Sequence, residues 1–104
     1  MIRRQVLMMN IEQKVKQKRK QILEIAAKYG AYNVRLFGSI VRGDATENSD
    51  VDFLVQLEPR CKLFDWLHLE EDLESLLGKR VDVVQEEAMK GKMLERALKE
   101  AIPL

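Results

Sequence analysis

Apolar side chains recur at helical spacing in the first third of the chain, which predicts an amphipathic helix from about residue 11 to residue 29. The positions on this stripe are Ile11, Val15, Ile22, Ile25, Ala26 and Tyr29. Asn10 can cap the start of the helix, because its side-chain oxygen can accept a hydrogen bond from an early backbone N–H. Gly30 is a suitable residue at which the helix can end.

Three short apolar runs, residues 34–37, 51–57 and 80–84, predict β-strands. The second run is apolar at nearly every position, as in a strand that is buried on both faces. Residues 39–42 between the first two runs predict a short helix, and the polar residues 44–49 predict a loop.

Two more helices are predicted, one up to the glycine at position 78 and one over residues 87–100. The segment between the second and third strands is long enough for a crossover, so we expect these two strands to be parallel. The shorter connection between the first two strands favours an antiparallel pair. The sequence therefore predicts one α/β (α+β) domain over residues 1–104, with a small three-stranded mixed sheet flanked by helices.

Composition agrees with a globular domain of this size. Of the 104 residues, 46% are hydrophobic and 34% charged, which indicates a soluble, folded chain. No apolar run approaches the ~18 residues of a membrane span. Cys61 is the only cysteine, so no internal disulfide can form and we expect a reducing, cytoplasmic setting.

Charge is unevenly distributed along the chain. Residues 1–20 contain seven Lys or Arg against one acidic residue, and we expect residues 1–21 to form a basic helical arm. Such an arm can be a solvated helix face, or can contact nucleic acid, an acidic partner or a substrate triphosphate. Residues 44–77 contain ten Asp or Glu against two basic residues, a balance that attracts divalent cations.

Three aspartates lie at the predicted strand starts. Asp50 and Asp52 are two residues apart at the start of the second predicted strand, where alternation would place both carboxylates on one face. Asp82 lies within the third strand, and parallel pairing would bring it beside them. Each of these features has an alternative interpretation when it is taken alone. An Asp-x-Asp pair also occurs in turns, and Asp82 could be a surface residue of an edge strand. Together, the three carboxylates suit a two-metal site for phosphoryl or nucleotidyl transfer, with Mg²⁺ or Mn²⁺ as the ions.

Gly38 and Ser39 follow the first predicted strand and open the short helix. Glycine permits a tight turn and a close backbone approach, and a serine at a helix start can hydrogen-bond a phosphate oxygen. Arg42, one turn later, could add positive charge to the same site. These residues suit the binding of a metal-bound triphosphate.

Gly-Ser, ten residues, and then Asp-x-Asp resembles the signature of the DNA polymerase β-like nucleotidyltransferase superfamily. The short chain resembles its minimal nucleotidyltransferase branch, from about residue 22 to the C-terminus. The resemblance implies that Asp50, Asp52 and Asp82 bind the metal ions. It also implies that Gly38 and Ser39 form the turn that binds the triphosphate of ATP.

Members of this branch are typically encoded beside a HEPN-domain ribonuclease toxin. The resemblance implies Mg²⁺-dependent transfer of AMP from ATP to a tyrosine hydroxyl of that toxin, with this chain as the antitoxin and a hetero-oligomer with the toxin as a possible assembly. A small-molecule acceptor such as an aminoglycoside is an alternative, although it usually needs a further substrate-binding domain. The sequence is also compatible with an antitoxin that acts by contact alone and, less favoured, with a nucleic-acid-binding protein.

Other residues have less specific interpretations. Trp66 and Phe64 are expected in the core rather than in a base-stacking platform. Met89, Met93 and Leu94 could belong either to the core or to a surface that binds a partner, because flexible methionines adapt to such surfaces.

Overall fold

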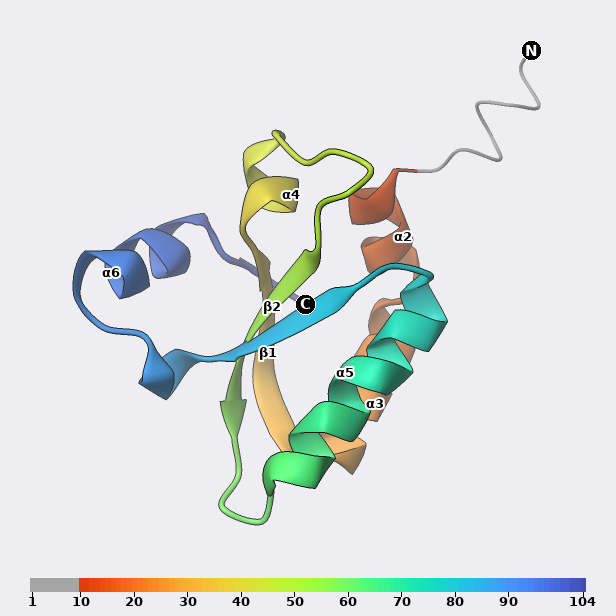
Figure 1. Cartoon of the computed structure of the whole chain (residues 1–104), viewed down its shortest axis with the longest axis vertical. Helices are drawn as coiled ribbons and strands as arrows, with labels where there is room; N and C mark the ends of the chain where they lie inside the picture. Colours follow the sequence, from red (N-terminus) through yellow and green to blue (C-terminus); the bar gives the residue numbers. More distant parts are fainter. Residues whose placement is uncertain (1–9) are drawn as a thin grey trace.

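A four-stranded mixed sheet with the order β3-β2-β1-β4 organises the chain, in a computed structural model that describes residues 10–104 (Figure 1). The elements, in chain order, are α2 (Ile11–Gln17), α3 (Arg19–Lys28), β1 (Ala31–Phe37), α4 (Ser39–Arg42), β2 (Val51–Leu57), α5 (Leu63–Leu77), β3 (Val81–Gln85), the 3₁₀ turn η1 (Glu86–Ala88), α6 (Gly91–Glu100) and β4 (Ile102–Pro103). The α/β (α+β) class predicted from the sequence is confirmed.

The strand pairing follows the prediction, with one addition. β2 runs antiparallel to β1 and parallel to β3. The prediction of three strands was wrong by one, because Ile102 and Pro103 add β4 to the free edge of β1. The Leu104 amide extends this pairing by donating to the Val34 carbonyl at 3.0 Å. A two-residue strand containing proline has too little apolar alternation to be detected in the sequence.

The predicted N-terminal helix is divided at Lys18 into α2 and α3. Val15 on α2 and Ile22 on α3 are both fully buried. The part of the predicted basic arm that the structure describes, residues 10–21, therefore carries Val15 into the core. Residues 1–9, including the two N-terminal arginines, lie outside the described part of the chain.

Asn10 caps α2 as predicted. Its Oδ1 accepts a hydrogen bond from the Gln13 amide at 2.8 Å, and the Gln13 side chain accepts one from the Asn10 amide at 3.3 Å. We expect Asn10→Ala to lower the free energy of unfolding by about 1 kcal/mol, because one helix N–H loses its acceptor. Urea unfolding measures this change. Asn48→Ala in the exposed loop is the control, and an equal loss in both variants would contradict the capping role.

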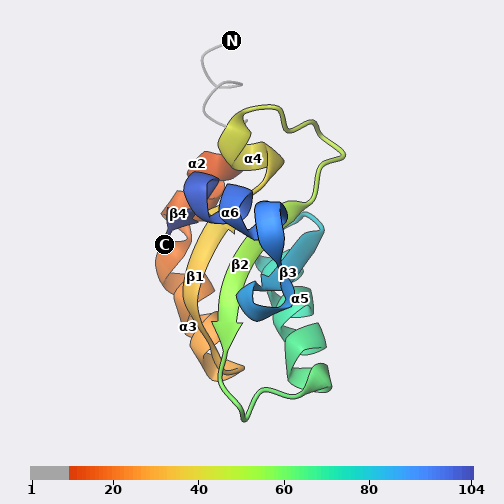
Figure 2. The same cartoon turned by 90° about the vertical axis from the view of Figure 1, so that its left-hand side faces the viewer.

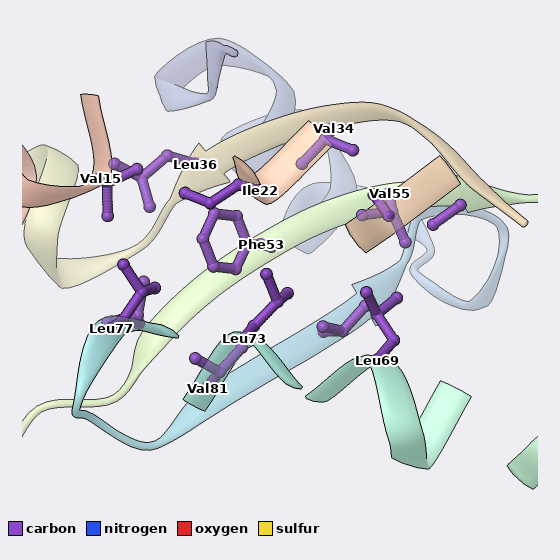
Figure 3. Packing of buried hydrophobic residues seen from close by; sticks show 14 of the residues in the cluster. Val15, Ile22, Val34, Leu36, Phe53, Val55, Leu69, Leu73, Leu77 and Val81 are labelled. Atoms are coloured by element: carbon purple, nitrogen blue, oxygen red, sulfur yellow. The ribbon is translucent and has the colours of Figure 1, made fainter. Parts of the chain in front are cut away.

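The main core lies between the sheet and the helices α2, α3 and α5 (Figure 3). Phe53 at the centre of β2 is fully buried, and Leu69, Leu73 and Leu77 from successive turns of α5 belong to the same buried cluster. Burying such side chains contributes roughly 1.5–3 kcal/mol each. This core fixes β2 and β3 side by side, and so fixes the aspartates that they carry.

On the opposite face of the sheet, α6 lies over one end of β1 and β2, across the sheet from α3 and α5 (Figure 2). The predicted helix over residues 87–100 is interrupted, since η1 ends at Ala88 and α6 begins at Gly91. Ala97 is the buried residue of α6. Met93 is 69% exposed, so the partner-surface interpretation fits it better than the core one.

Trp66 and Phe64 differ although both were expected in the core. Trp66 is partly buried against the core, and its Nε1 donates to the Val83 carbonyl at 3.0 Å. Phe64 is 72% exposed, so its assignment to the core was wrong. The periodicity of α5 points Leu69 and Leu73 inward and leaves Phe64 on the outer side of the first turn.

None of the helices within residues 10–104 is long and apolar enough to cross a membrane.

Candidate active site

Asp52 and Asp82 lie side by side across two parallel strands. The register of β2 and β3 pairs Asp52 with Asp82, as the predicted crossover required. The antiparallel register of β1 and β2 pairs Phe37, the last residue of β1, with Asp52. The turn from β1 into α4 therefore begins beside the two aspartates.

Gly38 is in direct contact with the Asp52 carboxylate. Its φ of +84° lies in the left-handed region that favours glycine. A β-carbon at position 38 would overlap Asp52 Oδ2. Position 38 therefore requires glycine for two reasons: the backbone conformation, and the space that the Asp52 carboxylate occupies. The sequence indicated a close backbone approach at Gly38, but not that a carboxylate of the protein itself lies against it.

Ser39 begins α4, the short helix that follows this turn. The first N–H groups of a helix have no acceptor within the helix, so they are available to an anion. The Ser39 carbonyl accepts from the amides of Gly43 at 3.0 Å and Asp44 at 3.1 Å, which closes the turn after the helix. Ser39 therefore lies in the part of the chain where a phosphate-binding turn was predicted.

The Asp52 carboxylate has an unfavourable environment for its negative charge. Burial and the neighbouring carboxylates of Asp82 and Asp50 raise the pKa of Asp52 from 3.8 to about 6, while Arg42 opposes the shift. A bound cation would relieve this repulsion and make the ionised form favourable. The electrostatics of the site thus favour a positively charged ligand.

Asp50 is differently placed from Asp52. It precedes β2, so strand alternation does not fix its direction, and its Oδ1 accepts from Arg80 Nε at 3.2 Å. It also lines a separate hollow of about 470 Å³, between the loop before β2 and the turn before β3. Among residues 10–104, no three carboxylate, imidazole or thiol groups are close enough together to enclose one ion. The three aspartates are neighbours, but Arg80 still engages Asp50.

Arg42 is held by a residue that the sequence did not reveal. Its NH1 donates to the two oxygens of Glu100 at 3.0 and 3.2 Å, and its Nε lies 3.5 Å from Asp44 Oδ2. The Glu100 side chain is only 15% exposed. Fifty-eight residues separate Arg42 from Glu100, so no local pattern in the sequence could have paired them.

A cleft of about 240 Å³ opens onto Asp52. The end of β1 and α4 contribute one wall, formed by Phe37, Gly38 and Arg42. The segment through α6 contributes the other wall, and its residues are Met89, Met93, Arg96, Ala97 and Glu100. Two of the predicted triphosphate-binding residues and one of the predicted metal ligands thus line one cleft.

The donor set fits a divalent cation of the magnesium class. Asp50, Asp52 and Asp82 supply only oxygen ligands, which Mg²⁺ and Mn²⁺ prefer. Burial, and then the charges of Asp82 and Asp50, raise the pKa of Asp52, and a bound cation would favour its ionised form. Asp50 would have to exchange its ion pair with Arg80 for the metal, and Arg80 is 80% exposed and free to move into solvent.

Comparison with known proteins agrees with this arrangement. Residues 9–104 match the family model for the nucleotidyltransferase domain. Protein adenylyltransferase MntA of Thermococcus cleftensis is 42% identical over 79 residues, which are 76% of this chain and 80% of that protein.

Solved structures show the same fold. A structure provisionally named a minimal nucleotidyltransferase is 44% identical, with a TM-score of 0.80 over 92% of this chain and 97% of the other. A toxin–antitoxin crystal structure with AMP-PNP has a TM-score of 0.67 at 21% identity, over 81% of this chain and 69% of the other, and shares the fold. The family model, the sequence identities and the site agree, so this chain belongs to the nucleotidyltransferase domain family, as an enzyme of its minimal branch.

Proposed function

We propose that this chain transfers AMP from ATP to a tyrosine hydroxyl of a HEPN-domain ribonuclease toxin, and that it acts as the antitoxin of that toxin. The observation that carries the proposal is the contact between the β1–α4 turn and Asp52, which is paired in turn with Asp82. Gly38 lies against the Asp52 carboxylate, and Asp52 is in register with Asp82. This arrangement puts a turn suited to phosphate beside carboxylates suited to Mg²⁺.

The relatives support protein as the acceptor. The T. cleftensis relative is named a protein adenylyltransferase, and the more distant crystal structure is of a toxin–antitoxin with AMP-PNP, an ATP analogue. A small-molecule acceptor is less favoured, because the cleft is about 240 Å³ and open to solvent at an exposed Met93. A second protein that carries the acceptor hydroxyl would cover the open side of this cleft.

Each residue of the site has a role in the proposed reaction. Asp50, Asp52 and Asp82 would hold Mg²⁺, which neutralises the charge of the triphosphate when bound. The backbone of Gly38 and Ser39, with the guanidinium of Arg42, would hold the phosphates in place. The acceptor oxygen forms a bond to the α-phosphorus of ATP, the bond from that phosphorus to the bridging oxygen breaks, and pyrophosphate leaves. We assign receipt of the hydroxyl proton to Asp82, which is exposed beside Asp52.

The proposal is tested with labelled ATP, Mg²⁺ and the purified product of the adjacent reading frame. We expect AMP on a tyrosine of that protein, and we expect Asp50→Asn to lower the rate by about 100-fold or more, because one anionic ligand is lost. Glu47→Gln is the matched control: it removes one negative charge from the wall of the same hollow and should leave the rate within about twofold. Mass spectrometry of the acceptor identifies the modified residue.

The outcomes separate the proposed reaction from contact-only inhibition and from a small-molecule acceptor. A complex that forms without any transfer of label would favour an antitoxin that acts by contact alone. Label on a small molecule, with none on the partner, would favour the small-molecule acceptor. Transfer that survives Asp50→Asn would contradict the role of Asp50 in metal binding.

A further inference from the structure

We infer that the α6 wall of the cleft is the docking surface for the acceptor protein, and that it receives an acidic segment of that protein. This inference rests on the proposed function, since it concerns how the acceptor reaches the same site. The surface consists of four exposed residues of α6, the helix that Figure 2 shows in front of the sheet: Lys92, Met93, Arg96 and Lys99.

The direction of the reaction places the acceptor on this wall. In nucleotidyl transfer, the attacking and leaving oxygens lie on opposite sides of the phosphorus. The proposed triphosphate site is at Gly38 and Ser39, on the wall formed by β1 and α4. An acceptor oxygen must therefore approach from the other side. Met93 and Arg96 of α6 line that other side of the cleft.

Most of the α6 wall is exposed, so a partner protein can reach it. Ala97 is the buried residue of this helix, and Met93 is 69% exposed at the edge of the cleft. A solvent-exposed methionine next to catalytic carboxylates leaves apolar surface uncovered, and a partner that covers it would also exclude water from the cleft.

The charges on this wall select the kind of partner. A second hollow of about 570 Å³ adjoins the cleft and is bounded by four cationic side chains against two anionic ones. These residues are Arg42, Lys92, Arg96 and Lys99, with Glu95 and Glu100. Glu100 is engaged by Arg42 at 3.0 Å and lies 3.9 Å from Arg96. Within residues 10–104, neither Lys92 nor Lys99 forms an ion pair, so both charges are available to carboxylates of a partner.

The spacing fits an extended stretch of partner chain. Lys92 and Lys99 are separated by about 10 Å along the helix axis. Arg96 lies between them in sequence and lines both hollows, so the cationic surface leads directly to Asp52. A segment with acidic residues beside its hydroxyl-bearing residue would meet both features.

The experiment compares two double variants that change net charge equally. Lys92→Glu with Lys99→Glu reverses two charges on the proposed surface. Arg19→Glu with Lys20→Glu reverses two exposed charges on α3, on the opposite face of the sheet. For each, calorimetry measures the Kd for the purified product of the adjacent reading frame, and steady-state kinetics gives separate KM values for that protein and for ATP.

We expect the α6 variant to weaken binding and raise the acceptor KM by about tenfold or more, with the ATP KM unchanged and the α3 variant like the wild type. Raising NaCl from 50 to 300 mM should weaken wild-type binding more than binding of the α6 variant. An unchanged Kd in the α6 variant would overturn the inference. So would a raised KM for ATP alone, since the lysines would then serve the triphosphate, or an equal loss in the α3 variant.

Binding of the partner and transfer of AMP are measured separately, so the experiment distinguishes failure of the docking surface from failure of the proposed reaction. If the wild type binds the partner without transferring AMP, the proposed reaction fails, yet loss of binding in the α6 variant still supports the docking surface. If the wild type transfers AMP and the α6 variant does so with unchanged Kd and KM, the docking surface is wrong and the proposed reaction stands. Loss of RNA binding in the α6 variant, with binding of the partner protein unchanged, would assign the lysines to nucleic acid and overturn the inference.

Discussion

Asp52→Asn is expected to lower the rate of AMP transfer by about 100- to 1,000-fold while making the metal-free protein more stable at neutral pH. The loss of rate follows from removing an anionic ligand at the centre of the site. Asparagine keeps the shape of the side chain, so its neighbours can stay in place. Initial rates with labelled ATP at saturating Mg²⁺ measure this loss.

The gain in stability follows from the pKa of the same carboxyl group. Asp52 has a pKa of about 6 in the folded protein, above its ordinary value of 3.8. A carboxyl with a raised folded pKa contributes stability that is fully present below pH 3.8 and is lost as the pH rises through 6. At pH 7.5 the ionised group therefore costs stability, by about 1 kcal/mol when screening by solvent is allowed for. Asparagine removes that cost.

Thermal unfolding without metal measures the stability effect across pH. We expect Asp52→Asn to raise Tm by about 5 °C at pH 7.5 and to have little effect at pH 3.5. Glu71→Gln on the outer face of α5 neutralises one charge far from the site and is the control. Adding Mg²⁺ should raise the Tm of the wild type more than that of Asp52→Asn, because the ion binds the native site. A variant less stable than the wild type at pH 7.5 would contradict the proposed repulsion.

The core strands and the position of the site could be predicted because their signals are local and strong. Residues 51–57 form a nearly continuous apolar run, and β2 has those bounds. The long connection to β3 required a crossover, and the resulting parallel register brings Asp82 beside Asp52. The site follows from this topology, because a parallel neighbour of β2 starts at the same edge of the sheet.

Features that depend on distant contacts were not predictable. No glycine or proline marks the break at Lys18, where α2 ends and α3 begins. The extension of β1 back to Ala31 passes through Asn33 at a φ of +52°, a bulge that interrupts the alternation that would have revealed it. The pairing of Arg42 with Glu100 joins α4, in the middle of the chain, to the end of α6, 58 positions later.

The direction of helix faces was also only partly predictable. Periodicity identifies an apolar stripe, but it does not show which apolar residues at its margin a neighbouring element covers. Phe64 lies on the outer side of the first turn of α5, away from the side that carries Leu69 and Leu73, and so remains exposed. Met93 is exposed for a comparable reason, since α6 contacts the sheet chiefly through Ala97.

Gly38→Ala is the second change with a large expected effect, and Gly43→Ala is a partial control for it. Gly38 and Gly43 have nearly the same φ, +84° and +83°, but their ψ values differ. Gly43, with ψ at +12°, is in the αL region, where alanine costs roughly 1–2 kcal/mol, whereas Gly38, with ψ at −156°, is in a region that essentially only glycine occupies. A β-carbon at position 38 overlaps the Asp52 carboxylate, whereas one at position 43 meets no atom within 4 Å. The difference between the two variants therefore combines the contact with Asp52 and the greater backbone strain at position 38.

We expect Gly38→Ala to lower the free energy of unfolding by about 1–3 kcal/mol more than Gly43→Ala, because the carboxylate must move. The same movement displaces a proposed metal ligand, so transfer should fall about 100-fold in Gly38→Ala and only a few-fold in Gly43→Ala. Chemical unfolding and initial rates measure the two effects. Equal losses of stability in the two variants would contradict the expected overlap with Asp52.

A double-mutant cycle then tests whether Asp52 is the group that Gly38 accommodates. Asp52→Ala removes the overlapping oxygen, so Gly38→Ala should cost clearly less in that background than in the wild type. Gly43→Ala, which meets nothing, should cost the same in both backgrounds. A coupling of about 1 kcal/mol or more between positions 38 and 52, with none between 43 and 52, is the expected result. If Gly38→Ala costs the same in both backgrounds, then the glycine is required for its backbone conformation alone, and the turn does not hold Asp52 in place.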